Sequence, residues 1–322
     1  MSADCMCLVT ALQCKGREMI VVSSGRVAAG LLALMFVLLT GPAAVSADEP
    51  YLEQDVSFLL GEERIAGTLV KPAHAARPPV VLILPGTSGR RDGPPISGDG
   101  RGLFRRTAQL WAENGIASLR ISTRGRGGSD GLFEDMTLER RIEEAQGAVD
   151  WLSDRDDLDG SRISVLGHSQ GTIVAAALAG RLDQAQRIQS VVLWAPVADP
   201  LASYRRSMGA LTLEKGLHAG PDEIVRWRGA GGTMRAFKTG FFRGLLTINT
   251  LAEIEPYRGR LLIVTGRRDA WSRTADAQVF RGHGSGEVSF VEFDVGHRMG
   301  ASEGVAAVDE VAGYVMDWLK AE

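Results

Sequence analysis

Apolar runs and segments of helical period alternate along most of the chain. Pro79 to Leu84 (PVVLIL) is a continuous apolar run, which is typical of a strand buried on both faces of a sheet. Similar runs recur with amphipathic segments between them, and this alternation predicts a mostly parallel, doubly wound α/β sheet with flanking helices. We expect strands at 56–60, 65–70, 79–84, 116–121, 162–166, 189–193, 260–264 and 288–293, and helices at 102–114, 138–152, 170–182 and 303–320. The first two strands should form a hairpin, because Gly61-Glu62-Glu63 between them supplies turn residues.

The interval 200–250 interrupts this alternation. It holds no clear strand, and its apolar residues recur at loosely helical spacing, so we expect a small helical cap inserted into the domain. Eight basic and three acidic residues lie in the interval, whereas the whole chain has a net charge of −3. Either this charge belongs to a solvated helical face, or the cap steers anionic substrates. The large apolar residues of the interval could wall an acyl pocket or simply pack the helices; they include Leu211, Leu213, Trp227, Phe237, Phe241 and Phe242.

An apolar segment near the N-terminus has the pattern of a secretory signal. Val27 to Leu39 is unbroken apolar sequence, preceded by Arg26 and followed by small residues up to Ala47. The run is shorter than the roughly 20 residues that cross a bilayer. We therefore expect residues 1–47 to be a signal peptide and 48–322 to be the mature domain, exported to the periplasm or secreted. An uncleaved membrane anchor and a buried core helix are the alternatives.

Composition and charge exclude several classes of protein. With 45% hydrophobic and 23% charged residues the chain is globular rather than disordered. The net charge of −3 gives no basic footprint for a nucleic-acid partner. All three cysteines precede the expected cleavage site, so the mature domain does not depend on disulfides. No group of histidine and acidic residues has the spacing of metal ligands, and no cofactor is expected.

The segment Gly167-His-Ser-Gln-Gly171 carries the strongest chemical signal. It is a G-x-S-x-G sequence between an expected strand and an alanine-rich helix, the context in which a sharp turn exposes the serine above a sheet. The glycines two positions to either side of Ser169 leave room for that strained turn. Free serine is a poor nucleophile, so this motif requires a histidine base and a carboxylate that orients the histidine.

Residues after two later strands can supply the base and the carboxylate. Asp269 and His297 each follow an expected strand, and together with Ser169 they give the chain order Ser, Asp, His. His297 is the one histidine of five that follows the final strand. Asp199, after an earlier strand, is the competing carboxylate, and Asp294 is better explained as a strand-end residue.

Backbone amides must hold the oxyanion that forms during acyl transfer. One expected donor is the amide of Gln170, directly after the nucleophile. The second should come from the loop after strand 79–84, Pro85-Gly-Thr-Ser-Gly89, whose glycines let a substrate approach. Thr87 is the expected donor in this loop, with Ser88 as the alternative.

Four segments in order resemble the α/β-hydrolase superfamily, more narrowly its exported or membrane-associated bacterial esterase-like members. The segments are Leu84 to Gly89, Arg124 to Gly131 (RGRGGSDG), Gly167 to Gly171, and the tail with Gly266, Asp269 and His297. The resemblance covers nearly all of residues 56–320 and implies the α/β-hydrolase fold. It departs at Pro85, where such relatives usually have histidine, and this leaves the loop conformation and substrate preference open. It also implies that segment 124–131 lines the site; a nucleotide-binding register is not met, because Asp130 stands where the last glycine would be.

Together these features predict a serine hydrolase that cleaves carboxylic esters of a small-molecule acyl substrate. In this hypothesis Ser169 attacks, His297 moves the proton, Asp269 orients His297, and water releases an acyl-enzyme. Thioesterases and peptidases use the same machinery and remain alternatives, as does a non-catalytic binding protein on the same scaffold. A membrane partner is expected only if the N-terminal apolar segment is not cleaved.

Overall fold

The computed structural model of the protein describes residues 49–181, 188–229, 232–283 and 286–321. The expected signal peptide, residues 1–47, lies outside these described residues, and its assignment stays a prediction. Among the helices of the described ranges, none is both long and apolar enough to cross a bilayer.

A mixed sheet of eight strands forms the centre of the described domain. The strands are β1 (Tyr51–Leu60), β2 (Glu63–Pro72), β3 (Val80–Leu84), β4 (Ala117–Ile121), β5 (Ile163–His168), β6 (Ile188–Trp194), β9 (Arg260–Gly266) and β10 (Val288–Phe293). They lie side by side in the order β1-β2-β4-β3-β5-β6-β9-β10. The six from β4 to β10 in this order are parallel, whereas β2 is antiparallel to both of its neighbours. The mostly parallel sheet expected from the alternation is therefore confirmed.

The first two strands form the expected hairpin, but with a tighter turn. Leu60 pairs with Glu63, so only Gly61 and Glu62 lie between the paired residues. Gly61 has a φ of 60°, in the left-handed region that such two-residue turns require and that glycine adopts without strain.

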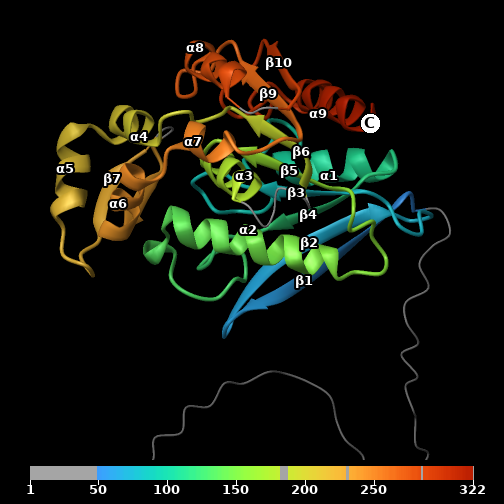
Figure 1. The fold of residues 1–322 in the computed structure, drawn as a ribbon, viewed down its shortest axis with the longest axis horizontal. Coiled ribbons are helices and arrows are strands. Elements are labelled where there is room, and N and C mark those ends of the chain that lie inside the picture. The colour runs from blue at the N-terminus through green and yellow to red at the C-terminus, as the bar shows by residue number, and fades with distance from the viewer. Residues whose placement is uncertain (1–48, 182–187, 230–231, 284–285, 322) are drawn as a thin grey trace, which may run out of the picture. The chain divides into compact units, whose positions relative to one another are not determined.

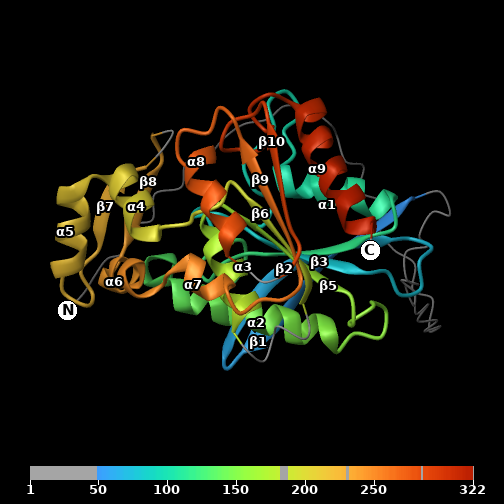
Figure 2. The same cartoon turned by 45° about the horizontal axis from the view of Figure 1, so that its top comes forward.

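Helices cover both faces of the sheet (Figures 1 and 2). Helices α1 (Leu103–Glu113) and α9 (Val305–Lys320) pack together on one face, where the indole N–H of Trp111 donates to the carbonyl of Ala312 at 2.9 Å. Helices α2 (Leu138–Ser153), α3 (Gln170–Gly180) and α7 (Thr250–Ile254) lie on the other face. Short helices η1 (Phe133–Asp135), α8 (Thr274–Ala277) and η3 (Gln278–Gly282) complete this part of the fold.

Strand β3 shows why a central strand must be apolar throughout. Successive side chains of a strand point to opposite faces. Val80, Leu82 and Leu84 join the core beneath α2 and α3, whereas Val81 and Ile83 join the core beneath α1 and α9. A polar residue at any of these positions would be buried, which accounts for the continuous apolar run.

The interval 200–250 forms an insertion between β6 and β9, at the left of Figure 1. It contains α4 (Pro200–Met208), α5 (Ala210–His218), β7 (Val225–Arg228), β8 (Met234–Phe237) and α6 (Thr239–Thr247). The expectation that it holds no clear strand is wrong, because β7 and β8 form an antiparallel pair. In β7, buried and exposed residues alternate over only four positions, too short a run to distinguish from helical spacing.

Aromatic residues give the insertion a core of its own. The rings of Phe237 and Phe241 are 4.5 Å apart, and Trp227 stacks on Phe241 at 6.0 Å. Phe133 contacts Phe237 at 5.3 Å and connects this core to the main domain. Most of the expected wall residues therefore pack the insertion, and Leu211 is 83% exposed.

Candidate active site

Ser169 lies on a strained turn between β5 and α3. Its φ and ψ are 54° and −119°, outside the regions that non-glycine residues readily adopt. A Cβ atom on Gly167 would lie 2.3 Å from the carbonyl oxygen of Gly171, and one on Gly171 would lie 2.2 Å from that of Leu84. The two glycines of the motif are therefore required by close packing of the turn against itself and against β3.

The structure brings the side chains of Ser169, Asp269 and His297 together. Ser169 Oγ is 2.9 Å from His297 Nε2, and His297 Nδ1 is 2.8 Å from Asp269 Oδ2. The Asp269 side chain is fully buried, and its Oδ1 accepts the backbone N–H groups of Trp271 at 2.7 Å and Ser272 at 3.0 Å. An ionised carboxylate only accepts hydrogen bonds, so Nδ1 of His297 carries its proton and Nε2 is free to accept one from the serine.

The two other carboxylates considered for this role have different partners. Asp199 begins helix α4, where its Oδ1 accepts the N–H of Ala202 at 2.9 Å. Asp294 forms an ion pair with Arg268 at 3.2 Å. Within the described residues, neither carboxylate makes a hydrogen bond with His297.

His168, which the sequence analysis did not single out, supports the His297 loop. Its Nε2 is 2.9 Å from the carbonyl oxygen of His297. Burial and, to a lesser extent, the neighbouring His297 lower the pKa of His168 to about 4. A neutral ring places its proton on Nε2, from which it donates to that carbonyl. No pattern in the sequence marks the position before the serine for such a role.

The loop after β3 runs beside Ser169. A Cβ atom on Gly86 would lie 3.3 Å from the Cβ atom of Ser169. The N–H of Gly89 donates to the carbonyl of Gly86 at 3.0 Å and closes a turn around Thr87. The amide of Gln170 is in the first turn of α3, where backbone N–H groups have no partner within the helix. Both amides expected to bind an oxyanion thus belong to segments that adjoin Ser169.

A ring of hydrogen bonds, here called the Tyr204 network, holds this loop against α3 and the insertion. Arg141 donates to Gln170 Oε1 at 2.6 Å and to the carbonyl of Pro85 at 2.5 Å. Gln170 Nε2 donates to the Tyr204 hydroxyl at 2.7 Å. That hydroxyl is also 2.7 Å from Thr87 Oγ1. Tyr204 belongs to α4, so the insertion takes part in holding the loop.

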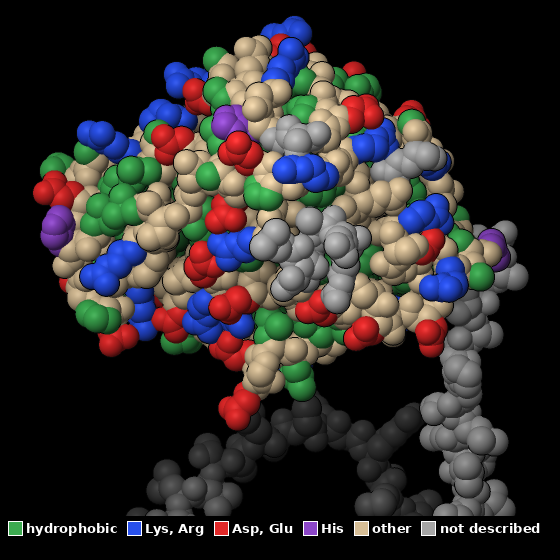
Figure 3. All heavy atoms as spheres, viewed as in Figure 1, with side chains coloured by type: hydrophobic (Ala, Val, Ile, Leu, Met, Phe, Trp, Pro, Cys, Tyr) green, Lys and Arg blue, Asp and Glu red, His purple; other side chains and the backbone are tan. Residues whose placement is uncertain are grey.

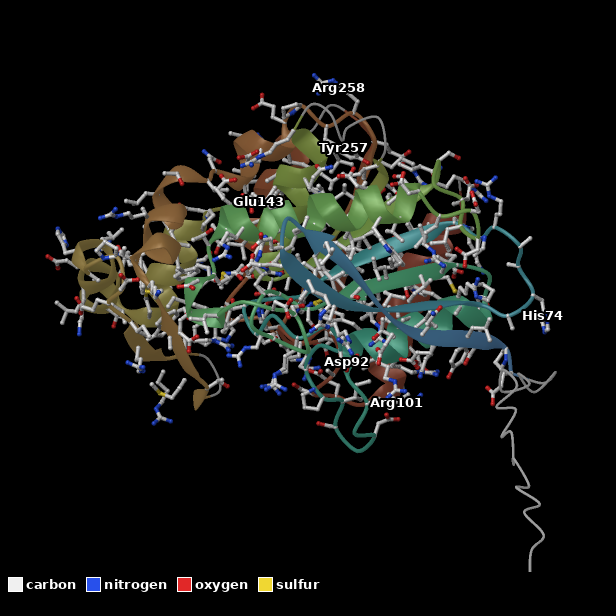
Figure 4. The ribbon with its side chains drawn as sticks, turned by 90° about the horizontal axis from the view of Figure 1, so that it is seen from below. His74, Asp92, Arg101, Glu143, Tyr257 and Arg258 are labelled. Carbon is white, nitrogen blue, oxygen red and sulfur yellow. The ribbon has the colours of Figure 1, made fainter. Side chains whose placement is uncertain are left out.

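Buried charges on α2 lie behind this network. Desolvation lowers the pKa of Arg141, whereas the charge of Glu144 raises it. Burial raises the pKa of Glu144 to about 7, although Arg141 opposes the shift. Glu144 Oε1 accepts the N–H of Arg124 at 3.1 Å and so fixes the start of the glycine-rich loop after β4. The neighbouring Glu143, labelled in Figure 4, is exposed, and its Oε2 forms an ion pair with Arg124 at 3.8 Å.

Ser169 and His297 face a cavity of about 600 Å³. Of the expected wall residues, Trp227 lines the cavity, and Tyr204 and Met234 of the insertion line it as well. The glycine-rich loop contributes Arg126, in agreement with its expected place beside the site.

Three neighbours along the β3–α1 segment differ in their contacts. Arg90 lines the cavity. Arg91 instead forms an ion pair with Asp55 at 3.1 Å, and Asp92, labelled in Figure 4, pairs with Arg120. Across the described residues, no group of three or more histidine, cysteine or acidic side chains could hold a metal ion.

Comparison with known proteins places the chain in a family. The model of the X-Pro dipeptidyl-peptidase (S15) family matches residues 49–226, more than half of the chain. The chain belongs to the S15 family. This family assignment makes the protein a hydrolase of the α/β-hydrolase superfamily, as the motifs suggested. The match to the S15 family includes Ser169 and ends before Asp269 and His297. Among curated proteins nothing matches this S15 family member.

Solved structures share the fold of this S15 family member. Est1E from Butyrivibrio proteoclasticus, with bound ferulic acid, has 21% identity and a TM-score of 0.66, covering 82% of this chain and 98% of its own. The α/β hydrolase GrgF from Penicillium sp. sh18 has 20% identity and a TM-score of 0.64, and the match covers 84% of this chain and 98% of GrgF. The esterase domain of a Rhodothermus marinus protein has 18% identity and a TM-score of 0.61, and the match covers 83% of this chain and 97% of that domain. These likenesses confirm the expected α/β-hydrolase fold.

Proposed function

We propose that this S15 family member is an esterase that cleaves carboxylic esters through an acyl-enzyme on Ser169. The observation that carries the proposal is the continuous hydrogen-bond relay from Ser169 through His297 to Asp269 at the wall of a cavity. Its two distances, 2.9 Å and 2.8 Å, are those of direct hydrogen bonds. This relay supports the proposal, because acyl transfer needs a nucleophile, a base and an orienting group connected in this way.

The chemistry proceeds in two halves. Ser169 Oγ attacks the ester carbonyl while its proton passes to His297 Nε2, and the imidazolium formed is stabilised by the buried carboxylate of Asp269. The amides of Gln170 and Thr87 hold the oxyanion. As the ester C–O bond breaks, His297 returns the proton to the departing alcohol. Water then attacks the acyl-enzyme while His297 takes its proton. The acid is released, and His297 returns the proton to Ser169.

The charge of the cavity favours an ester over an X-Pro dipeptide. A dipeptide released from an N-terminus carries a positively charged α-amino group, which a binding site stabilises with carboxylates or other acceptors. The described residues that line the cavity include four arginines and no aspartate or glutamate. This wall repels an ammonium group, so the peptidase activity in the family's name is the second candidate.

A direct comparison of substrates tests the proposal. Wild-type protein and Ser169→Ala are assayed on para-nitrophenyl esters of short acids and on an X-Pro para-nitroanilide. We expect ester hydrolysis by the wild type, and a loss of at least about 10³-fold in kcat for the variant. Faster cleavage of the anilide than of every ester would make the protein a peptidase. Full ester activity in Ser169→Ala would show that another residue is the nucleophile.

A further inference from the structure

Four arginines from separate parts of the chain converge on the cavity. Arg90 follows β3, Arg126 lies in the loop after β4, Arg235 belongs to β8, and Arg298 follows His297. The cavity is therefore lined by positive charge from both the main domain and the insertion. On the molecular face drawn in Figure 3, by contrast, basic and acidic side chains are interspersed.

These four guanidinium groups have no anionic partner within the described part of the chain. None of them takes part in an ion pair or donates a side-chain hydrogen bond there. Neighbouring arginines outside the cavity are paired: Arg91 with Asp55 at 3.1 Å, and Arg124 with Glu63 at 2.6 Å. Arg91 and Arg124, which are close in sequence to Arg90 and Arg126, thus have the partners that the arginines of the cavity wall lack.

Arg126 and Arg235 are the half-buried members of this set. Burial lowers the pKa of Arg126, the charge of Arg90 lowers it further, and the charge of Glu134 raises it without an ion pair. Burial likewise lowers the pKa of Arg235; the neighbouring Tyr204 opposes this shift, and the charge of Arg126 adds to it. Both side chains thus line one cavity with their positive charge partly desolvated, and an anion bound in that cavity would offset this cost.

The guanidinium of Arg126 also packs on an aromatic ring. Its central carbon lies 3.9 Å from the centre of the Phe133 ring. Its Nε is buried and has no hydrogen-bond partner. Guanidinium N–H groups lie in the plane of the group and match the two oxygens of a carboxylate. A guanidinium that packs on a ring and has no ion-pair partner in a substrate cavity is suited to bind such an anion.

We propose that the natural substrate is an ester that carries a free carboxylate, and that Arg126 and Arg235 bind this carboxylate while Ser169 attacks the ester. The proposal rests on the esterase function proposed above and adds the substrate class. Arg90 and Arg298, which are exposed, add to the attraction without being buried beside the ligand. A cavity of about 600 Å³ is large enough for a small ester with both groups.

Two matched pairs of esters test this substrate class. Mono-para-nitrophenyl adipate and its methyl ester differ in a carboxylate on the acyl side. Para-acetoxybenzoate and its methyl ester differ in a carboxylate on the alcohol side. For at least one pair, we expect the wild type to have a kcat/KM at least about tenfold higher for the anion at low salt, and a smaller preference at high salt. Equal kcat/KM values within both pairs at low salt would overturn the proposal.

Variants assign the preference to particular side chains. Arg126→Gln and Arg235→Gln should each lower kcat/KM for the preferred anion by about ten- to a hundredfold and change that of its methyl ester less than about threefold. Arg226→Gln is the matched control, because Arg226 is exposed on β7, the partner strand of β8, and does not line the cavity. Equal losses on both members of the pair would show a structural role only and would contradict the assignment.

A binding measurement separates this proposal from the esterase function. Adipate binding to the wild type is followed by isothermal titration calorimetry, with no ester present. If no ester is hydrolysed but adipate binds and Arg126→Gln abolishes the binding, the esterase function fails and the anion site stands. If esters are hydrolysed without preference and adipate does not bind, the anion site fails and the esterase function stands.

Discussion

The hydroxyl of Tyr204 connects the insertion to the loop that carries Thr87, and Tyr204→Phe removes this hydroxyl alone. In the wild type it accepts a hydrogen bond from Gln170 Nε2 at 2.7 Å and lies 2.7 Å from Thr87 Oγ1. The ring stays in place in the variant, because it packs edge-on against Phe241 at 5.1 Å. The substitution therefore tests the Tyr204 network with little change in packing.

The expected effect follows from what is left without a partner. Gln170 is fully buried, so its Nε2 loses its acceptor where water does not replace it. A buried donor without a partner costs about 1–3 kcal/mol, and we expect the free energy of unfolding to fall by that amount. Release of Thr87 loosens the loop that presents its amide. Complete loss of one oxyanion donor costs about 10²–10³ in kcat, so we expect a loosened donor to lower kcat about tenfold with KM within twofold.

Urea unfolding and steady-state kinetics on a neutral ester measure these two effects. Tyr314→Phe is the control, since Tyr314 is 42% exposed on α9. It should leave both the stability and kcat unchanged. A stability loss in Tyr204→Phe with wild-type kcat would refute the idea that the network positions the loop. Wild-type values of both quantities would refute the network itself.

Three further substitutions test other parts of the account. Gly171→Ala places a Cβ atom 2.2 Å from the carbonyl oxygen of Leu84, so we expect urea unfolding to show a loss of about 1–3 kcal/mol; wild-type stability would contradict this packing. The pKa of His168 is about 4 against an ordinary 6.5, so its contribution to stability is present above pH 6.5 and lost as the pH falls through 4. This loss amounts to about 3 kcal/mol, and His168→Asn should remove it from the free energy of unfolding measured between pH 6.5 and 4. A variant with the same pH dependence as the wild type would contradict the burial of a neutral His168. The pKa of Glu144 is about 7 against 4.5, so its contribution is present below pH 4.5 and lost as the pH rises through 7. Glu144→Gln should flatten this opposite slope in the same assay, and a wild-type slope would show that the buried carboxyl does not titrate there.

Sequence patterns were sufficient for features that depend on one segment or on general sheet geometry. The apolar run of β3 predicted a central strand because both of its faces are covered. The order of Ser169, Asp269 and His297 suggested their proximity because the carboxyl ends of parallel strands lie at one edge of a sheet. The structure places the three side chains within hydrogen-bond distance of each other in that order.

Contacts between distant segments could not be predicted in this way. His168 and the carbonyl of His297 are 129 positions apart, and Thr87 and Tyr204 are 117 apart. The first pair depends on how the loop after β10 folds back beside β5, and the second depends on where the insertion packs; no local periodicity records either. The two short strands of the insertion were missed for a different reason, since four alternating residues do not establish a period.

Labelling with a fluorophosphonate tests the central claim, that Ser169 is a nucleophile activated by His297, most directly. An activated serine attacks phosphorus, its Oγ–P bond forms and fluoride leaves, and peptide mass spectrometry locates the label. The account predicts one labelled peptide in the folded wild type, with the label on Ser169. It predicts no label in Ser169→Ala, and labelling in His297→Gln that is slower by at least about 10²-fold. A label on another residue, no label on the folded wild type, or labelling of His297→Gln at the wild-type rate would contradict the claim.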